Sequence, residues 1–256
     1  MKIQAKKHIS QRLNQEMQSL NTGGWSDRQK LALACRILHE EGHWRGLAGQ
    51  MTARVDGSSE MLTLGFGVGF DEARASRLAR VDQDLRPLGN SVMPNPGVRF
   101  HAWIYAQRPE IQAIVHTHPP ACAALSMTGE PLTVAHMDAT PLFDDCAFLP
   151  EWPGLPIGDE EGRIIAAAMG DKHAILLANH GLLAAGRSIE EACMLAVWME
   201  QAADMQLRAR ALGPVKAIDA ALAQESRDFL RRPKVLELTF ANFARRAVRA
   251  DGGVLL

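Results

Sequence analysis

Two histidines separated by a single residue are the feature of this sequence whose chemistry is easiest to recognise. They lie in Val115-His116-Thr117-His118-Pro119-Pro120, an apolar run that ends in two prolines. A β-strand directs residues two apart to the same face, so the two imidazoles would lie side by side. Imidazole is a common ligand of divalent metals. The alternative for any histidine is an ordinary structural hydrogen bond.

A third candidate ligand lies far downstream, at His180 in Leu177-Ala178-Asn179-His180-Gly181. This segment is another apolar run that breaks at a glycine. Taken alone, His180 is better explained as a strand-end histidine bonded to a carbonyl group. Three imidazoles with one open position are, however, more typical of a catalytic metal site than of a structural one.

The elements that would position these histidines follow from hydrophobic periodicity and from turn residues. Ser26 with Gln29, and Ser188 with Glu191, predict capping boxes at the starts of two helices. The His-x-His pair lies at the junction between an expected strand and the helix that follows it. Strands are expected over 51–55, 60–64, 111–118, 173–177 and 182–185, and helices over 26–42, 98–107, 121–127, 188–212 and 236–250.

Composition excludes several classes of protein. The chain has 256 residues, a net charge of -1 and four scattered cysteines without a Cys-x-x-Cys pair. The balanced charge argues against nucleic-acid or anionic-membrane partners. The basic N-terminus lacks an apolar signal core, and no apolar run reaches the roughly 18 to 20 residues that cross a bilayer. We therefore expect a soluble, cytoplasmic protein with reduced thiols.

Three regions are expected along the chain. Residues 1–24 are polar and end in Asn21-Thr22-Gly23-Gly24, which is typical of an N-terminal extension. Residues 25–213 form the main domain, which is large enough to bury a substantial core. Residues 214–256 form a helical tail with basic residues, for which a contact with another subunit is a better explanation than a nucleic-acid patch.

Three stretches of the sequence together resemble the class II aldolase and adducin head-domain family. The stretches are Gly46 to Arg54, Arg108 to His118, and Leu176 to Gly181 with Gly186 to Ala192, and their order and spacing match over roughly Trp25 to Leu212. The resemblance implies an α/β fold with three α/β/α layers around a mostly antiparallel sheet. It also implies a homotetramer or other homo-oligomer, and a divalent metal held by His116, His118 and His180. Zinc is the first choice, with manganese or cobalt as alternatives.

The sequence departs from the sugar-phosphate aldolases of this family at two sites. Those enzymes place an acidic general acid/base shortly before the His-x-His, where this chain has Gly97. Their phosphate cradle uses hydroxyl and amide side chains, where this chain has Gln50, residues 64–67 including Gly67, and residues 95–97. Anions need N–H and O–H donors, so a phosphorylated sugar is disfavoured. Gln50, Gly67, Gly97 and Arg99 are the candidate substrate-binding residues, Arg99 as a partner for a substrate carboxylate.

His136, Tyr105 and His101 are the residues that could replace the missing general acid/base. Decarboxylation needs an electron sink but no base to start it, and some family members are decarboxylases of hydroxylated aromatic acids. The resemblance therefore implies a metal-dependent lyase that cleaves a carbon-carbon bond of a small non-phosphorylated hydroxy-carbonyl or hydroxy-aromatic carboxylate, by aldol-type cleavage or by decarboxylation. The alternative is a non-catalytic, adducin-head-like oligomerisation protein, although a scaffold has no reason to keep three converging ligands.

Overall fold

The computed structural model describes residues 2–43 and 46–256, and the elements alternate between helices and short strands. The strands are β1 Gln50–Arg54, β2 Met61–Thr63, β3 Ala79–Val81, β4 Ala113–Thr117, β5 Cys146–Leu149, β6 Ala174–Leu177 and β7 Gly181–Gly186. The helices are α1 Lys2–Gln18, α2 Asp27–Glu40, α3 Arg99–Gln107, α4 Pro120–Ser126, α5 Asp159–Met169, α6 Ile189–Arg210, α7 Ala220–Leu230 and α8 Pro233–Ala250. Short 3-10 helices are η1 Phe70–Glu72, η2 Ala75–Arg77, η3 Pro96–Val98, η4 Met137–Leu142 and η5 Gly252–Leu255.

The strands form one sheet in the order β3-β2-β1-β4-β7-β6-β5. Every neighbouring pair is antiparallel except β5 with β6, which is parallel. The predicted pairing of 51–55 with 60–64 is confirmed, since β1 and β2 pair directly across their connecting turn. A mostly antiparallel sheet agrees with the expectation from the family resemblance.

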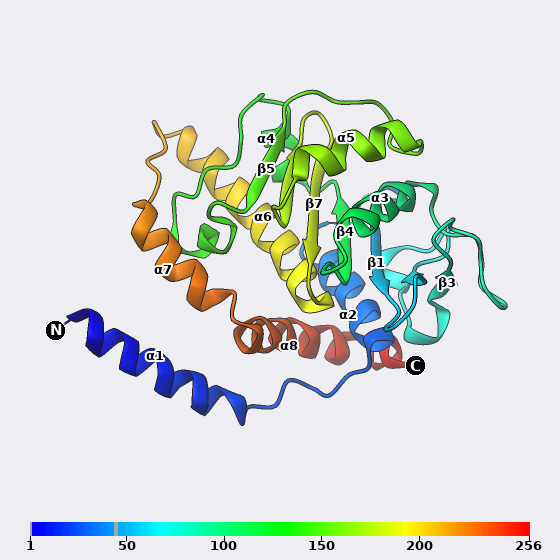
Figure 1. Ribbon diagram of the computed structural model, residues 1–256, viewed down its shortest axis with the longest axis horizontal. Helices are drawn as coiled ribbons and strands as arrows, with labels where there is room; N and C mark the ends of the chain where they lie inside the picture. Colours follow the sequence, from blue (N-terminus) through cyan, green and yellow to red (C-terminus); the bar gives the residue numbers. More distant parts are fainter. Residues whose placement is uncertain (1, 44–45) are drawn as a thin grey trace.

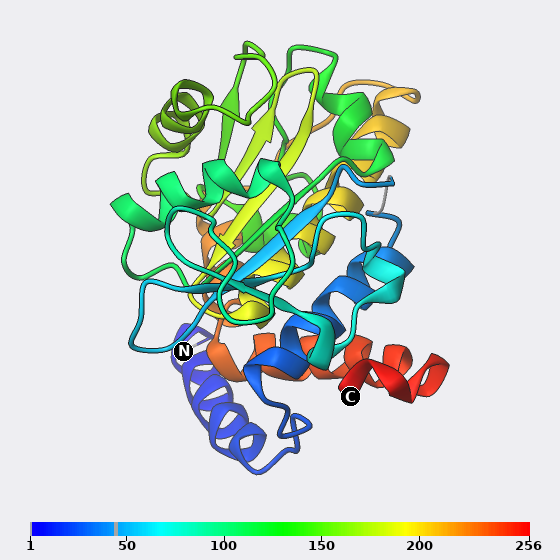
Figure 2. The same cartoon turned by 90° about the vertical axis from the view of Figure 1, so that its right-hand side faces the viewer.

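Helices cover both faces of this sheet, which makes three layers (Figure 1). Two successive residues of β4 point to opposite faces of the sheet. Ile114 packs in a cluster with Phe100 and Ile104 of α3, whereas Val115 packs with residues of α2 and α6. The view turned by 90° shows α3 and α5 on the other side of the strands from α2 and α6 (Figure 2). The α/β class with α/β/α layers is therefore confirmed.

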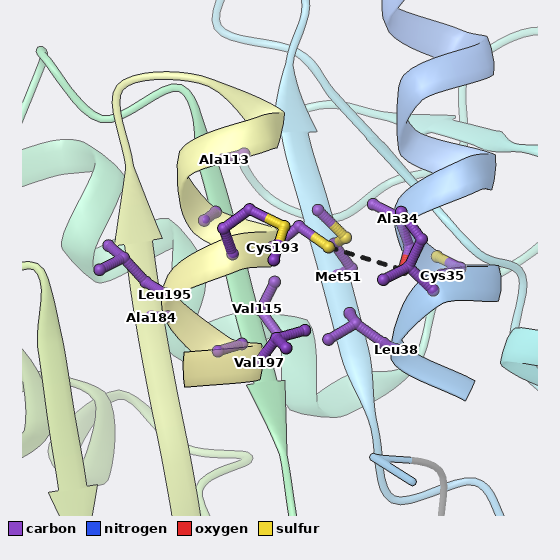
Figure 3. Packing of buried hydrophobic residues seen from close by; sticks show 14 of the residues in the cluster. Ala34, Cys35, Leu38, Met51, Ala113, Val115, Ala184, Cys193, Leu195 and Val197 are labelled. Carbon is purple, nitrogen blue, oxygen red and sulfur yellow. Dashed lines mark hydrogen bonds between the residues drawn. The ribbon is translucent and has the colours of Figure 1, made fainter. Parts of the chain in front are cut away.

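The larger core lies between the sheet and the pair α2 and α6 (Figure 3). Small side chains let α6 approach the strands closely, and Cys193 of this helix faces Ala34 of α2 across the core. Cys35 and Cys193 are fully buried free thiols, and burial raises the pKa of Cys35 to about 12. These two cysteines therefore act as small apolar residues that fill the core.

One of the two predicted capping boxes is complete. Ser26 accepts a hydrogen bond from the Gln29 backbone, and the Gln29 side chain accepts one from the Ser26 backbone. Ser188 accepts from the Glu191 backbone, as predicted, but the Glu191 carboxylate accepts from the Arg187 backbone instead of closing the second box. The remaining oxygen of Glu191 is thereby free to bind the guanidinium of Arg231.

The chain on both sides of the predicted 25–213 domain is helical. The 1–24 region contains α1, which contacts α8, and Arg232 donates hydrogen bonds to the backbone and hydroxyl oxygens of Ser10. In the 214–256 tail, α8 packs on α2 and α6 of the same chain. The predicted contact of this tail with another subunit stays a prediction. Among the described residues, no helix has both the length and the apolar character that a bilayer span requires.

Candidate metal centre

Three histidines from two distant parts of the chain meet at one end of the sheet. His116 is in β4, His118 follows directly after β4, and His180 is in the turn between β6 and β7. Their rings lie 4.5 to 4.8 Å apart, centroid to centroid, and one nitrogen of each lies within 4.8 Å of the others. The sequence prediction that these three side chains converge is thus met by the geometry.

Backbone contacts fix the orientation of the His116 ring. Its Nδ1 donates a hydrogen bond to the Leu182 carbonyl at 2.8 Å, so the proton is on Nδ1 and the lone pair is on Nε2. The His116 Nε2 lies 2.9 Å from Nε2 of His118. Phe100 of α3 packs edge-on against the His116 ring, with centroids 4.9 Å apart. The Nε2 lone pair of His116, which could bind a metal, therefore points toward the other two imidazoles.

The three imidazoles are neutral at physiological pH. Burial, followed by the nearness of His180 and His118, holds the pKa of His116 well below its ordinary value. Burial, and then His118, lowers the pKa of His180 to about 4, and burial lowers that of His118. Neutral imidazole is the form that binds a divalent metal, whereas the imidazolium form repels it. The donor set, three neutral imidazoles, fits zinc and similar ions.

The turn that carries His180 is built for a close approach to His118. Asn179 has a left-handed φ of 55°, and its backbone N–H donates to the Ser126 carbonyl at 3.2 Å. The Ser126 hydroxyl accepts from the His180 backbone at 3.3 Å. A Cβ atom on Gly181 would lie only 2.4 Å from the Thr117 carbonyl oxygen and 2.8 Å from Cδ2 of His118. Only glycine fits at position 181 without moving a metal-ligand candidate.

Helix α6 anchors the segment that leaves the site. Both oxygens of the Glu200 carboxylate accept hydrogen bonds at 2.8 Å, from the backbone N–H groups of Ala121 and Cys122 in the first turn of α4. A carboxylate at a helix N-terminus is favourable for the same reason that a cap is. Glu200 therefore fixes the start of α4, two residues beyond His118. Sequence reasoning missed this role, because one acidic residue in a long helix looks like any solvated side chain.

Gln50 lies beside the histidines, and Gly97 and Gly67 lie close to Gln50. Gln50 pairs directly with His116 across β1 and β4. A Cβ atom on Gly97 would lie 2.9 Å from Nε2 of Gln50, so the carboxamide fills the room that a larger residue at 97 would need. Gln50 and Gly67, with Asn95, line a small hollow in which no lining residue carries a charge. The Gln50 Oε1 is buried without a hydrogen-bond partner among the described residues.

His101 and Tyr105, two of the predicted catalytic residues, are buried between α3 and β1. The hydroxyl of Thr52 lies 2.9 Å from Nδ1 of His101 and 2.9 Å from the phenol oxygen of Tyr105. Burial lowers the pKa of His101 to about 3 and raises that of Tyr105. His101 is therefore neutral at physiological pH. Its partner Thr52 lies two residues along β1 from Gln50, which pairs with His116. A catalytic role for either residue stays a prediction.

Arg99 and His136 lie elsewhere. Nε of Arg99 donates to Asp159 at 2.8 Å, and Arg99 lines a cavity of about 250 Å³ beside Trp103 and Tyr105 that none of the three histidines lines. His136 immediately precedes η4, which packs on α6 and α7. Within the described part of the chain, no hydrogen bond or ring contact connects His136 to the three histidines, and its Nε2 is buried without a partner. Their predicted roles are untested by this arrangement.

Known proteins share both the sequence and the architecture. The chain is 31% identical over 204 residues to 3,4-dihydroxyphthalate decarboxylase of Arthrobacter keyseri, which covers 73% of this chain and 79% of the relative. It is also 31% identical over 157 residues to a 4-hydroxy-3-prenylphenylpyruvate oxygenase/4-hydroxy-3-prenylbenzoate synthase of Streptomyces roseochromogenus subsp. oscitans. That match spans 60% of this chain and 57% of the relative's length.

The structure is similar to that of an L-fuculose 1-phosphate aldolase from Glaciozyma antarctica, with a TM-score of 0.80 and 29% sequence identity. The superposition covers 88% of this chain and 90% of the other. The sequence model of the Class II Aldolase and Adducin N-terminal domain matches residues 29–207, which include all three histidines. This chain belongs to the class II aldolase and adducin N-terminal domain family.

Proposed function

We propose that this protein is a metal-dependent lyase that cleaves a carbon-carbon bond in a small non-phosphorylated substrate. The substrate class is a hydroxy-carbonyl compound or a hydroxy-aromatic carboxylate. The observation that carries the proposal is the convergence of His116, His118 and His180, whose donor nitrogens lie within 4.8 Å of one another. An inert scaffold gains nothing from three neutral imidazoles aimed at one point.

The three histidines are the residues that would hold the metal, and they fit it. Each is neutral, and His116 presents the nitrogen that does not donate to Leu182. A bound divalent ion supplies a Lewis acid that stabilises negative charge developing on a substrate oxygen. Zinc suits the donor set best, and cobalt or manganese would be accepted if water completes the coordination.

The hollow next to Gln50, the residue that pairs with His116, favours a substrate without a phosphate group. The hollow lined by Gln50, Gly67 and Asn95 contains no cationic side chain, and phosphate sites in proteins rely on cations and on concentrated N–H donors. The apolar side chains of Leu47 and Phe66 are about half exposed next to this hollow, at 49% and 48%. Such a surface suits the ring of a hydroxy-aromatic acid, in agreement with the names of the two relatives.

Decarboxylation suits the residues of the site better than aldol cleavage does. Aldol chemistry needs a group that moves a proton, and position 97, beside Gln50, is a glycine. The carboxamide of Gln50 does not titrate, and His101 is buried with its pKa lowered to about 3. Loss of carbon dioxide starts without a base, and the carbanion that it leaves can take its proton from water, so Gln50 needs only to orient the substrate by hydrogen bonds. The expected homotetramer and cytoplasmic location stay predictions.

The test combines metal analysis with substrate panels. Protein purified without added metal is analysed for bound ions, loaded with zinc, cobalt or manganese, and incubated with hydroxyaldehydes, keto acids and hydroxylated aromatic acids. Release of carbon dioxide from a hydroxylated aromatic acid is the expected result. Aldehyde release from an aldol substrate would show instead that another group moves the proton.

The second candidate is an assembly protein without chemistry, since the family also includes adducin domains. A purified protein that neither contains nor takes up a metal would support this second candidate. The candidate is contradicted if His118→Ala, which removes a ligand and leaves the surface elsewhere unchanged, abolishes metal uptake and turnover together.

A further inference from the structure

His43 is a fully buried histidine outside the three metal-ligand candidates. It follows α2, and its backbone N–H donates to the carbonyl of Leu38, a residue that faces the sheet from α2 (Figure 3). The side chain has 0% exposure, and its Nδ1 lies 2.9 Å from the hydroxyl of Thr117. Its Nε2 is buried and has no partner among the described residues.

Thr117 is the residue between the first two metal-ligand candidates. In the sheet it pairs with Leu182, which belongs to the core under α2 and α6, whereas His116 pairs with Leu183 in the core under α3. Successive side chains of a strand point to opposite faces. The hydroxyl of Thr117 therefore points away from the histidines and toward α2, where His43 binds it.

Contacts from two directions thus hold residue 117. His43 binds the side chain at 2.9 Å, and Gly181 leaves so little room that a Cβ there would lie 2.4 Å from the Thr117 carbonyl. A rotation of residue 117 about the strand axis would swing His116 and His118 with it. The contact with His43 opposes this rotation at the one residue that both ligands flank.

The bond does not depend on a charge on His43. Burial lowers the pKa of His43 to about 3, so the ring is neutral in either tautomer and can donate to or accept from the hydroxyl. An apolar pair of the same shape in place of His43 and Thr117 would give the folded protein about the same stability. Among the described residues only one nitrogen of His43 has a partner, and such an imidazole is a poor choice for core stability alone.

We propose that His43 is a positioning residue that holds His116 and His118 in their metal-binding directions through the hydroxyl of Thr117. This inference rests on the proposed function, because it assumes that the three histidines hold a metal. Groups that orient the ligands of a metal site typically change metal affinity by about 10- to 100-fold when they are removed. His43 would act in this way from the opposite face of the sheet.

The experiment measures metal binding and stability separately, in the full-length protein. Four variants are compared with the parent: His43→Leu, which removes the bond; His43→Asn, whose amide reaches the same hydroxyl; Thr117→Val, which removes the partner with little change in shape; and Thr140→Val as the control. Thr140 is also a buried threonine, but its hydroxyl donates to Met137 in η4. Zinc dissociation constants come from chelator competition, cobalt(II) spectra report ligand geometry, and urea unfolding of the metal-free protein reports stability.

We expect His43→Leu and Thr117→Val each to weaken zinc binding by about 10- to 100-fold and to change the cobalt spectrum. A fifth variant, which combines His43→Leu with Thr117→Val, should bind zinc no more weakly than either single variant, and His43→Asn should keep most of the parent's affinity. Thr140→Val should lower stability without changing zinc affinity.

Unchanged zinc affinity in both His43→Leu and Thr117→Val, with stability lowered as in Thr140→Val, would overturn the inference and leave the metal site standing. A parent protein that binds no zinc or cobalt would overturn the proposed function itself. The variant Thr117→Val keeps the test decisive if His43→Leu fails to fold.

Discussion

At the scale of single residues, the site depends on groups that set ring directions as much as on the ligands. The Leu182 carbonyl selects the tautomer of His116, Ser126 holds the backbone of the turn at 180, and Gly181 permits the approach of His118. These contacts hold the three imidazoles in directions that converge. A preorganised donor set loses less conformational entropy on binding than a flexible one.

His118→Ala should abolish metal retention and leave the fold intact. The side chain is partly exposed just beyond the end of β4, so its removal opens no cavity in either core cluster. Metal analysis after gel filtration should show loss of the bound ion, and circular dichroism should be unchanged. Loss of structure together with retained metal would contradict the assignment of His118.

Gly181→Ala should destabilise the protein by about 1–3 kcal/mol, the usual result of overpacking, and should weaken metal binding. The added methyl group would lie 2.4 Å from a backbone oxygen, which cannot rotate away, and 2.8 Å from the His118 ring. Urea unfolding and chelator competition measure the two effects.

Gly252→Ala is the matched control, because no atom lies within 4 Å of its Cβ position. It should change neither the free energy of unfolding nor metal affinity. Equal effects of the two substitutions would show that the close approach at Gly181 is unimportant.

The ligand candidates could be predicted from sequence, whereas their supporting residues could not. His116 and His118 follow from strand alternation, whereas His180 follows from the resemblance to the class II aldolase family. Glu200 binds backbone groups 78 and 79 residues away, and His43 binds a hydroxyl 74 residues away. Contacts at such separations depend on tertiary packing, for which local spacing contains no information.

At the scale of elements, the contacts of η3 and α3 with β1 determine where the side chains of β1 next to the histidines can lie. Gly97 of η3 faces Gln50 of β1, and His101 and Tyr105 of α3 face Thr52, the next β1 residue on the same side. Each contact joins a residue of η3 or α3 to a residue of β1. The size of residue 97 therefore decides where the Gln50 carboxamide can lie.

Gly97→Ala should destabilise the protein by about 1–3 kcal/mol, and Gln50→Ala should relieve most of that loss. The reason is that the new Cβ would lie 2.9 Å from Nε2 and 3.0 Å from Cδ of Gln50. A double-mutant cycle measured by urea unfolding should give a coupling of about 0.5–3 kcal/mol. Additive effects would show that Gly97 and Gln50 do not compete for the same space.

Elements with strong periodicity were predictable, and short or irregular ones were not. The helices at 26–42, 98–107, 121–127 and 236–250 correspond to α2, α3, α4 and α8 within a few residues. The sequence did not predict β3, β5 or α5. Both missed strands are short and lie at the edges of the sheet, where only one neighbouring strand pairs with them, and α5 follows a loop rich in proline and glycine.

At the scale of the whole molecule, a buried ionic cluster ties the C-terminal helices to the sheet. Arg231, between α7 and α8, binds Asp145 just before β5 and Glu191 at the start of α6, and all three side chains are less than 10% exposed. His173 donates to the Asp145 carboxylate from the other side, 3.0 Å away. The cluster fixes the tail relative to two elements of the main domain.

Arg231→Met should lower the free energy of unfolding by about 3–5 kcal/mol, because it leaves buried Glu191 without its cation and Asp145 with only the longer contact to Arg227, at 3.6 Å. The control Arg246→Met removes a 47% exposed side chain paired with Glu41 and should lower it by at most about 1 kcal/mol. Urea unfolding at neutral pH gives both values. Similar losses in the two variants would contradict a special role for Arg231.

The cluster also predicts a dependence of stability on pH. Burial acts to raise the pKa of Asp145, but the hydrogen bond from His173 and the charge of Arg231 outweigh it, and the pKa is lowered. The resulting stabilisation is fully present above the unfolded-state pKa of about 3.9 and is lost as pH falls through the lower folded-state pKa. In Arg231→Met, acid destabilisation should begin at a higher pH. Identical acid profiles for the parent and the variant would rule this out.

The two edges of the sheet have a consequence for how copies of this chain could associate. The edge strands β3 and β5 have three and four residues, so each offers only a few unpaired backbone groups. Short edges discourage strand-to-strand growth from one molecule into the next, the route by which sheets polymerise. Any assembly of this protein should therefore be closed by side chains of its helices and loops, and should resist conversion into fibres.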